Sequence, residues 1–360
     1  MNIYVNSRIY EQKTTGIWYY IQSLFTKLQN IDKNNYIFLQ TSHKKSLWNT
    51  YLLPGKSDGI FGIIFDIFST YIYLLFKWVR KSIYVWSSFF LPFWKVRSIK
   101  YIVVIYDLSF LIFPENHSIF FNFCYKYLTL RSINNADEII AISQNTKNDI
   151  IKFYGDRFRD KIKVIYPWIN EIFIDIRPTT RLVDGKYIFS VTTHPKRKNI
   201  ISVIKALGIL KLKWYVLKYV IAGLISKDQE IELRSEAKIA NVQDQIYLLW
   251  YISEKDLISL YQYCEVFIYP SFYEGFWFPI IEAIYSKTLV ITSNTSSMKE
   301  LVIDKNFLVD PRNVDDIVNK IESALDLNES QRNDIIAANL KFAKQFTRSN
   351  CSSEYVKLFN

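Results

Sequence analysis

The sequence predicts an α/β protein of two domains, each built around a parallel sheet with helices between its strands. Short runs of β-branched and aromatic residues, typical of buried strands, alternate with longer segments of helical pattern. This alternation stops over 166–185, where Pro, Thr and charged residues show no periodicity, and then starts again. The chain has 360 residues and is 50% apolar, which is enough for two hydrophobic cores. We expect one domain over 1–170, a second over 185–335 and a terminal helix over 336–360.

The first half of the chain predicts buried strands separated by helices. Ser143 fits the N-cap of a helix that runs to about Tyr154. Segments 44–59 and 82–92 are expected to be loops. Two further helices are predicted at Ile60–Phe76 and Ile119–Asn134, and we expect the aromatic residues of the latter in the core. The strands are predicted at Asn2–Asn6, Tyr36–Gln40, Tyr101–Ile105, Glu138–Ile142 and Lys161–Ile165.

The second half repeats the alternation. Pro279 fits the first turn of a helix, where its missing N–H costs nothing, and that helix ends near Lys287. The strands are predicted at Tyr187–Val191, Val216–Ala222, Gln245–Leu249, Glu265–Tyr269 and Thr288–Thr292. The other helices are predicted at Asn199–Leu210, Lys227–Ala240, Glu254–Tyr263 and about Gln331–Phe359.

Two carboxylates flank the predicted start of the helix at Pro279. Glu274 lies in the loop after a strand, and Glu282 follows eight residues later on the helix. Ligands of such β-α-β units sit beyond the carboxyl ends of the strands, and a helix N-terminus attracts anions. A carboxylate pair beside an anion-binding helix end suits a polyol that carries a phosphate, such as a nucleotide sugar. The alternative is a surface loop with two incidental glutamates.

This stretch resembles the E-x7-E region of the family-4 (group-1) glycosyltransferases. Trp277 stands where the family has a second Gly in the loop, and Lys287 and Leu289 replace the usual Gly and Pro at the helix end. The matching residues are Pro270, Ser271, Tyr273, Glu274, Gly275, Phe276, Pro279, Glu282 and Ala283, followed by Ser293, Asn294, Ser296, Ser297 and Glu300. The resemblance implies the GT-B fold: two Rossmann-like parallel-sheet domains facing a central cleft, with the acceptor side in the first domain and the donor side in the second. It also implies that the terminal helix packs back on the first domain.

Three other segments resemble the family's pattern. Residues 192–199 are similar to the family's GTLEPRKN and align Arg197 and Lys198, although a solvated charge run would look the same. Asp107 follows a strand as in the family's HDLS motif, with Tyr106 in place of the His, and a simple loop cap is the alternative. Gly16 matches the family's opening TG, where a tight turn brings the backbone near the donor phosphates, with Tyr19 where small or basic residues are common. A plain helix N-terminus is the alternative there.

The resemblance implies retaining transfer of a hexose from a nucleotide sugar to a hydroxyl. The acceptor implied is a lipid-linked oligosaccharide in surface polysaccharide (O-antigen or capsule) biosynthesis. Enzymes of this fold generally need no metal, and no cofactor is implied. The catalytic residues implied are Glu274, Asp107 and Lys198, and the donor-binding residues are Arg197, Lys198, Glu274, Gly275, Phe276, Trp277, Glu282 and Gly16. Two alternatives stay open: a non-catalytic GT-B partner of a polysaccharide assembly complex, and another GT-B nucleotide-sugar enzyme.

The charge of the chain bears on its partners. The net charge is +11, and without a recognisable nucleic-acid module it favours an anionic membrane surface over nucleic acid. Residues 60–76 are apolar but short for a membrane span and contain Asp66, so an interfacial helix and a buried core helix are equally supported. Three scattered cysteines and the absence of a signal-peptide pattern predict a cytoplasmic protein, compatible with a peripheral place on the inner membrane face. The lack of Gly-x-Gly-x-x-Gly argues against a dinucleotide oxidoreductase.

Overall fold

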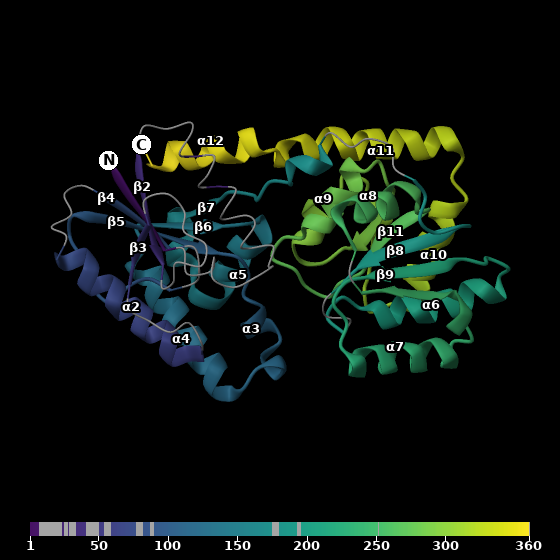
Figure 1. Cartoon of the computed structure of the whole chain (residues 1–360), viewed down its shortest axis with the longest axis horizontal. Coiled ribbons are helices and arrows are strands. Elements are labelled where there is room, and N and C mark those ends of the chain that lie inside the picture. Colours follow the sequence, from purple (N-terminus) through teal and green to yellow (C-terminus); the bar gives the residue numbers. More distant parts are fainter. Residues whose placement is uncertain are drawn as a thin grey trace. The chain divides into compact units, whose positions relative to one another are not determined.

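The described chain forms two compact units (Figure 1). The computed structural model describes residues 1–6, 24, 28, 34–40, 50–53, 59–76, 82–86, 90–174, 180–192, 196–250 and 252–359. The first unit takes Met1–Trp168 together with Arg348–Asn360, and the second takes Ile169–Thr347. Every strand pairing in the described sheets is parallel, which confirms the predicted fold class.

The first unit is built on a seven-stranded sheet in its described residues. Its strands are β1 (Asn2–Asn6), β2 (Asn35–Gln40), β3 (Thr50–Leu52), β4 (Ser82–Trp86), β5 (Ile99–Ile105), β6 (Glu138–Ala141) and β7 (Ile162–Val164). They are ordered β3-β2-β1-β4-β5-β6-β7, so β1 and β4 meet at the point where the chain order reverses. Side chains alternate between the faces of a strand, and one face brings Tyr4, Tyr84 and Tyr101 into a single core.

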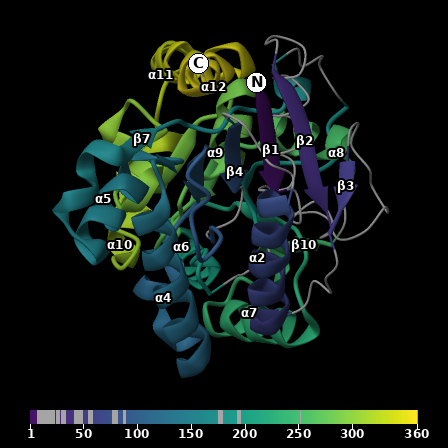
Figure 2. The same cartoon turned by 90° about the vertical axis from the view of Figure 1, so that its left-hand side faces the viewer.

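Helices complete the first unit. They are α2 (Gly59–Phe76), α3 (Ser109–Ile112), α4 (Ile119–Asn135), α5 (Gln144–Tyr154) and α12 (Arg348–Phe359). Figures 1 and 2 show α2 and α4 on the same side of the sheet, and Ile67 of α2 and Leu128 of α4 enter the same core. The terminal helix α12 contacts β5 and β2: Lys100 Nζ donates to the Leu358 carbonyl at 3.2 Å, and the rings of Tyr36 and Phe359 lie 6.4 Å apart.

The second unit has a six-stranded sheet in its described residues. Its strands are β8 (Tyr187–Val191), β9 (Lys218–Ala222), β10 (Ile246–Leu249), β11 (Val266–Tyr269), β12 (Val290–Ser293) and β13 (Leu308–Val309), ordered β10-β9-β8-β11-β12-β13. Its helices are α6 (Ile200–Leu212), α7 (Lys227–Ile239), α8 (Glu254–Tyr263), α9 (Phe278–Tyr285), α10 (Val314–Leu325) and α11 (Glu329–Ala343). Figure 1 shows α6 and α7 on one side of this sheet and α8, α9 and α11 on the other.

Short 3-10 helices connect several of these elements. They are η2 (Pro114–Asn116), η3 (Asp156–Lys161), η4 (Glu171–Phe173), η5 (Gln243–Gln245), η6 (Ser296–Glu300), η7 (Lys305–Phe307) and η8 (Lys344–Phe346). The last of them interrupts the helix expected over 331–359. That segment therefore forms α11 in the second unit and α12 in the first.

Two segments expected to be loops contain strands. β4 lies within 82–92 and pairs with both β1 and β5. A strand in the middle of a parallel sheet is buried on both faces, so it lacks the polar alternation that marks a half-buried strand. β3 lies within 44–59 and is only three residues long, at the edge of the sheet.

The helix predicted over 60–76 has one side that is buried, as in a core helix, and another that exposes apolar residues, as in an interfacial helix. α2 packs one side into the core, where Asp66 is buried and accepts a hydrogen bond from Asn6 at 3.3 Å. Its other side exposes apolar residues, including Phe65, Phe68 and Phe76. Among the described helices, none is both long and apolar enough to cross a membrane.

Candidate active site

Two loops of the second unit meet at adjacent strand ends. β8 and β11 are neighbours where the chain order of the sheet reverses, which is where open α/β sheets bind ligands. The loop after β8 carries Arg197 and Lys198, and the loop after β11 carries Glu274. The loops are joined because Ser271 Oγ and the Phe272 N–H donate to the Arg197 carbonyl at 3.0 and 3.1 Å. These hydrogen bonds between the two loops bring together Arg197, Lys198 and Glu274, the three charged residues that the sequence predicted for the donor site.

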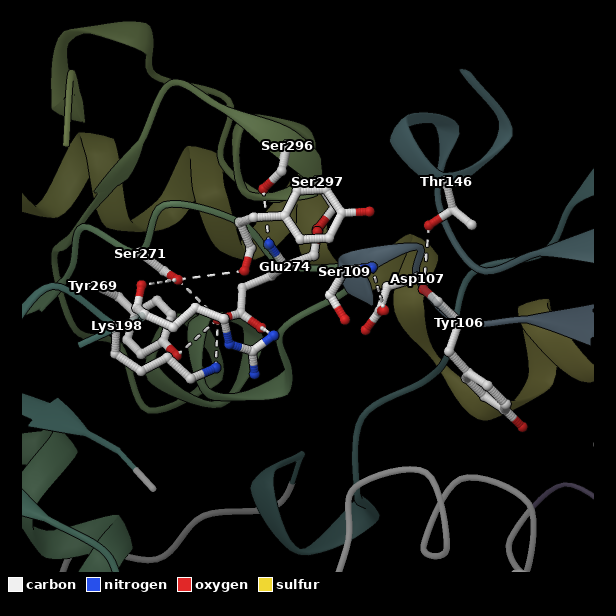
Figure 3. A network of polar contacts seen from close by, with 12 residues as sticks. Tyr106, Asp107, Ser109, Thr146, Lys198, Tyr269, Ser271, Glu274, Ser296 and Ser297 are labelled. Carbon is white, nitrogen blue, oxygen red and sulfur yellow. Dashed lines mark hydrogen bonds and ion pairs between the residues drawn. The ribbon is translucent and has the colours of Figure 1, made fainter. Parts of the chain in front are cut away.

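Glu274 is the centre of a buried polar network (Figure 3). Its side chain is only 4% exposed and forms an ion pair with Lys198. Its Oε1 also accepts hydrogen bonds from Ser271 Oγ at 2.8 Å and from the Tyr269 hydroxyl at 3.2 Å. Arg197 Nη1 lies 3.8 Å from Oε2. The carboxylate is thus fixed by neighbours from both loops.

The backbone of Glu274 is held as firmly as its side chain. Its N–H donates to Ser296 Oγ at 3.0 Å, and its carbonyl accepts from Ser297 Oγ at 2.8 Å. Both serines lie on η6, just after β12, and both are buried. The sequence marked these serines only as members of a motif, and the structure gives them a positioning role.

Lys198 is fully buried beneath aromatic rings. Its Nζ lies 3.2 Å from the centre of the Trp277 ring and 5.3 Å from that of Tyr269. The two rings stack at 4.9 Å with an angle of 17° between their planes. An ammonium on an aromatic face is stabilised by the ring quadrupole, most strongly when water is excluded. Trp277, which replaces the family's glycine, therefore forms part of the cover of the ion pair.

Glu282 lies on α9 and contacts α8 rather than the ion pair. Its Oε2 accepts a hydrogen bond from the hydroxyl of the buried Tyr261 at 3.0 Å. Burial raises the pKa of Glu282 to about 7, against the lowering effect of that hydrogen bond, and the charge of Glu254 adds to the increase. Glu282 thus changes its charge near neutral pH, and only its ionised form is a strong acceptor for a ligand hydroxyl.

Two neighbouring residues of the predicted donor site are buried as well. The ring of Phe276 packs against those of Phe278 at 5.3 Å and Phe346 at 5.7 Å. Its side chain therefore serves the packing of the second unit, which leaves its backbone as the part suited to a ligand. Gly275 is also buried in this loop.

Asp107 belongs to the first unit, at the carboxyl end of β5. Its Oδ1 accepts a hydrogen bond from the Ser109 N–H at 2.9 Å, which forms a side-chain turn within the loop that leads into α3 (Figure 3). Tyr106, which replaces the family's His, is buried, and its carbonyl accepts from Thr146 Oγ1 at 3.2 Å. The other predicted residues of this side, Gly16 and Tyr19, lie outside the described residues.

One structural residue near the site was not predicted. Gly223 follows β9 with a φ of +137°, and a Cβ there would lie 1.8 Å from the Thr192 carbonyl oxygen. Only glycine fits such a close approach of two backbones at the strand ends. In the sequence, the one sign of this role is that Gly223 directly follows a predicted strand. Within the described residues, no group of three or more His, Cys, Asp or Glu side chains is placed to hold a metal ion.

Comparison with known proteins agrees with this geometry. The profile of the family described as "Glycosyl transferases group 1" matches residues 173–341. The chain is 28% identical over 292 residues to the O-antigen chain mannosyltransferase B of Escherichia coli, covering 78% of this chain and 74% of the relative. It is 24% identical over 312 residues to the O-antigen chain mannosyltransferase RfbU of Salmonella typhimurium, covering 82% and 83%.

Solved structures share the whole fold. The crystal structure of Anabaena HepE in complex with UDP and glucose superimposes with a TM-score of 0.73, covering 99% of each chain at 14% identity. The two parallel-sheet units of this chain therefore have the GT-B fold. The second unit thus matches the group 1 glycosyltransferase family over residues 173–341, and the chain is similar to O-antigen mannosyltransferases.

Proposed function

We propose that the chain transfers a hexose, with mannose as the first candidate, from a nucleoside diphosphate sugar to a hydroxyl of a lipid-linked oligosaccharide. The observation that carries this proposal is the cluster of Arg197, Lys198 and Glu274 at the β8–β11 switch point. Within this described cluster two cations face one carboxylate, so the cluster has an excess positive charge that suits a diphosphate. The O-antigen relatives support mannose as the sugar and a growing polysaccharide as the acceptor.

In the reaction, the bond between the anomeric carbon and the diphosphate oxygen breaks, and its electron pair stays on the diphosphate. A bond forms between the anomeric carbon and the acceptor oxygen, whose proton must leave. The leaving diphosphate gains negative charge in the transition state, so cations beside it lower the barrier. We assign this stabilisation to Arg197 and Lys198, and the holding of the sugar to Glu274.

Asp107 and Glu282 receive separate roles. Glu282, in its ionised form, is assigned to the ribose hydroxyls, which are remote from the reacting bond. Asp107 uses Oδ1 to accept the Ser109 N–H in the loop before α3. Its carboxylate is assigned to the acceptor hydroxyl, whose proton it can accept. Gly16 and Gly275 are assigned to the close approach of the backbone to the donor.

The test is turnover of a panel of nucleoside diphosphate sugars by the purified protein, with and without a lipid-linked oligosaccharide. We expect release of the nucleoside diphosphate from one donor, increased by the acceptor. Trp277→Gly should broaden the range of donors accepted, because the ring lies beside the assigned sugar position, and Trp277→Phe is the matched control. Trp277 also favours a second candidate, a non-catalytic partner of an assembly complex, since its ring covers Lys198. A parent protein that turns over no donor would favour that candidate.

A further inference from the structure

Two helices of the first unit present apolar side chains outward. On α2 the outward residues are Ile64, Phe65, Phe68, Leu75 and Phe76, spaced along one side of the helix, and Phe76 is 83% exposed. The opposite side of α2 is buried in the core of the unit. A helix that is apolar all round normally has apolar surroundings on every side. The fold supplies such surroundings to only one side of α2.

α4 repeats this arrangement beside it. Its outward residues are Ile119, Phe120, Phe123 and Tyr127, with Ile119 89% and Phe123 70% exposed. This corrects the expectation that the aromatic residues of this helix lie in the core. Only some of them, such as Phe121 and Tyr125, pack against it.

The segment before β5 links the two helices. The exposed Trp94 ring lies 5.3 Å from that of Tyr71 on α2, and the neighbouring Phe93 ring lies under the guanidinium of Arg131 on α4 at 5.7 Å. Figures 1 and 2 show α2 and α4 on the same side of the sheet. We call the outward sides of α2 and α4 together with Trp94 the α2–α4 face.

The charge of the α2–α4 face has one sign. The only acidic residue of α2, Asp66, is buried, and α4 contains no acidic residue. Lys126 is exposed on α4, in line with Phe123 and Tyr127. Exposed helices elsewhere in the chain do not lack charge: α7, for example, exposes Lys227, Arg234 and Lys238. On α7 the exposed apolar residues Ile231 and Ile239 are interspersed with these charges, whereas the outward residues named for α2 and α4 are apolar, with Lys126 as the charge beside them.

We propose that the α2–α4 face docks on an anionic lipid bilayer, with its aromatic and aliphatic side chains in the interfacial layer. Phe and Trp beside a basic residue are the composition of interfacial segments. A second copy of the chain is less well suited, because a two-fold interface would bring two faces of the same positive sign together. The proposal rests on this surface alone and does not depend on the proposed reaction.

The test is partition of the full chain onto vesicles of phosphatidylcholine with about one third phosphatidylglycerol at low salt. The variant Phe65→Gln/Phe68→Gln/Phe123→Gln should bind at least about a hundredfold more weakly, because three rings leave the interface. The matched control is Leu212→Gln/Trp214→Gln/Val216→Gln, which removes three apolar residues that are 71–91% exposed in the second unit. It should bind like the parent. Lys126→Gln should weaken binding about fivefold, and added salt should remove that difference.

Oligomeric state and circular dichroism are measured for each variant, so that loss of folding is recognised. Equal partition of the two triple variants would overturn the proposal. The proposal would also be overturned if the parent were a dimer and the triple Phe variant were a monomer that partitions like the parent. That result would mean that the face binds a second copy of the chain. No donor is needed for this assay, so a failure of the proposed reaction would leave its result unaffected.

Discussion

Lys198 loses all its contact with solvent in the folded protein, and Glu274 nearly all. Taking two charges out of water is costly, and the pair is tolerated because Ser271 and Tyr269 add hydrogen bonds and Trp277 adds an aromatic face. Such a buried ion pair adds little to stability, but it holds its two charges in fixed positions. We infer that it sets the electrostatics of the site before a ligand arrives.

The first prediction concerns Lys198→Ala. It should lower kcat/KM by about 30- to 1000-fold, which corresponds to roughly 2–4 kcal/mol of lost transition-state stabilisation. It should also lower the free energy of unfolding by about 3 kcal/mol, because Glu274 is left buried without its ion-pair partner. Steady-state kinetics and urea unfolding measure the two effects.

The control for Lys198 is Lys213→Ala. Lys213 pairs with Glu322 at 2.8 Å but is 46% exposed, so its loss should cost less than about 1 kcal/mol and leave kcat/KM unchanged. A folded Lys198→Ala protein that transfers sugar at the parent rate would contradict the assigned role.

The second prediction concerns Glu282 and pH. Its folded pKa of about 7 lies above the value of 4.5 for the unfolded chain. Between these values the folded state keeps a proton that the unfolded chain has lost, so this group lowers stability as pH rises through the interval. Because Glu282 is partly exposed, we expect a penalty of about 1–2 kcal/mol above pH 7 rather than the full shift. Glu282→Gln should therefore stabilise the protein at about pH 8 and have little effect at about pH 5.

Urea unfolding at both pH values measures this difference, with Glu329→Gln at an exposed position of α11 as the control. Donor binding should tighten as Glu282 ionises. An identical pH dependence of stability in the parent and in Glu282→Gln would refute the shift.

At the scale of elements, α9 ends in a left-handed cap that is formed by a lysine. Lys287 stands where the family has glycine, and it adopts a φ of +59°. The Lys287 and Thr288 N–H groups donate to the carbonyls of Ile284 and Ala283, both at 3.0 Å, which closes the helix in a left-handed cap. A lysine in this conformation is strained by its Cβ.

The third prediction follows from this cap. Lys287→Gly should raise the free energy of unfolding by about 1 kcal/mol, because glycine adopts a positive φ without a steric penalty. Lys238→Gly, in the last turn of α7 with an ordinary helical conformation, should instead lower it by about 0.5–1 kcal/mol. Thermal and urea unfolding compare the two variants, and a destabilised Lys287→Gly protein would contradict the argument.

Most elements could be predicted from the sequence because their periodicity is local. The strand at 187–191 and the helix at 254–263 have the predicted bounds. β4 could not be predicted, because its strand character depends on its burial between β1 and β5. The ion pair of Lys198 with Glu274 joins residues 76 positions apart. The sequence indicated both residues for the site, but only the adjacent ends of β8 and β11 show that they bind each other.

At the scale of the whole molecule, α12 ties the end of the chain to the first unit. Cys351, Tyr355 and Phe359 are buried, and Leu358 accepts the hydrogen bond from Lys100 on β5. The second unit has a core of its own, formed between its sheet and helices such as α6 and α10. Each unit therefore has its own packing, and the last helix belongs to the packing of the first.

The fourth prediction is that removal of residues 348–360 destabilises only the first unit. Hydrogen exchange should show loss of protection in β2 and β5, and unchanged protection in β8 and β11. The exposed Lys357 on α12 gives a control, since Lys357→Ala should leave both units protected. Equal loss in both units would mean that they do not open separately.

The path of the chain through α12 also orders events during synthesis. Residues 169–347 are continuous, so the second unit has all its strands before the last helix leaves the ribosome. The first unit begins earlier but lacks α12 until residues 348–359 emerge. The parts of β2 and β5 that α12 contacts must therefore stay uncovered while the whole of the second unit is translated. The first unit is therefore translated first but completed last. A chaperone would be needed most during the interval in which the first unit lacks α12.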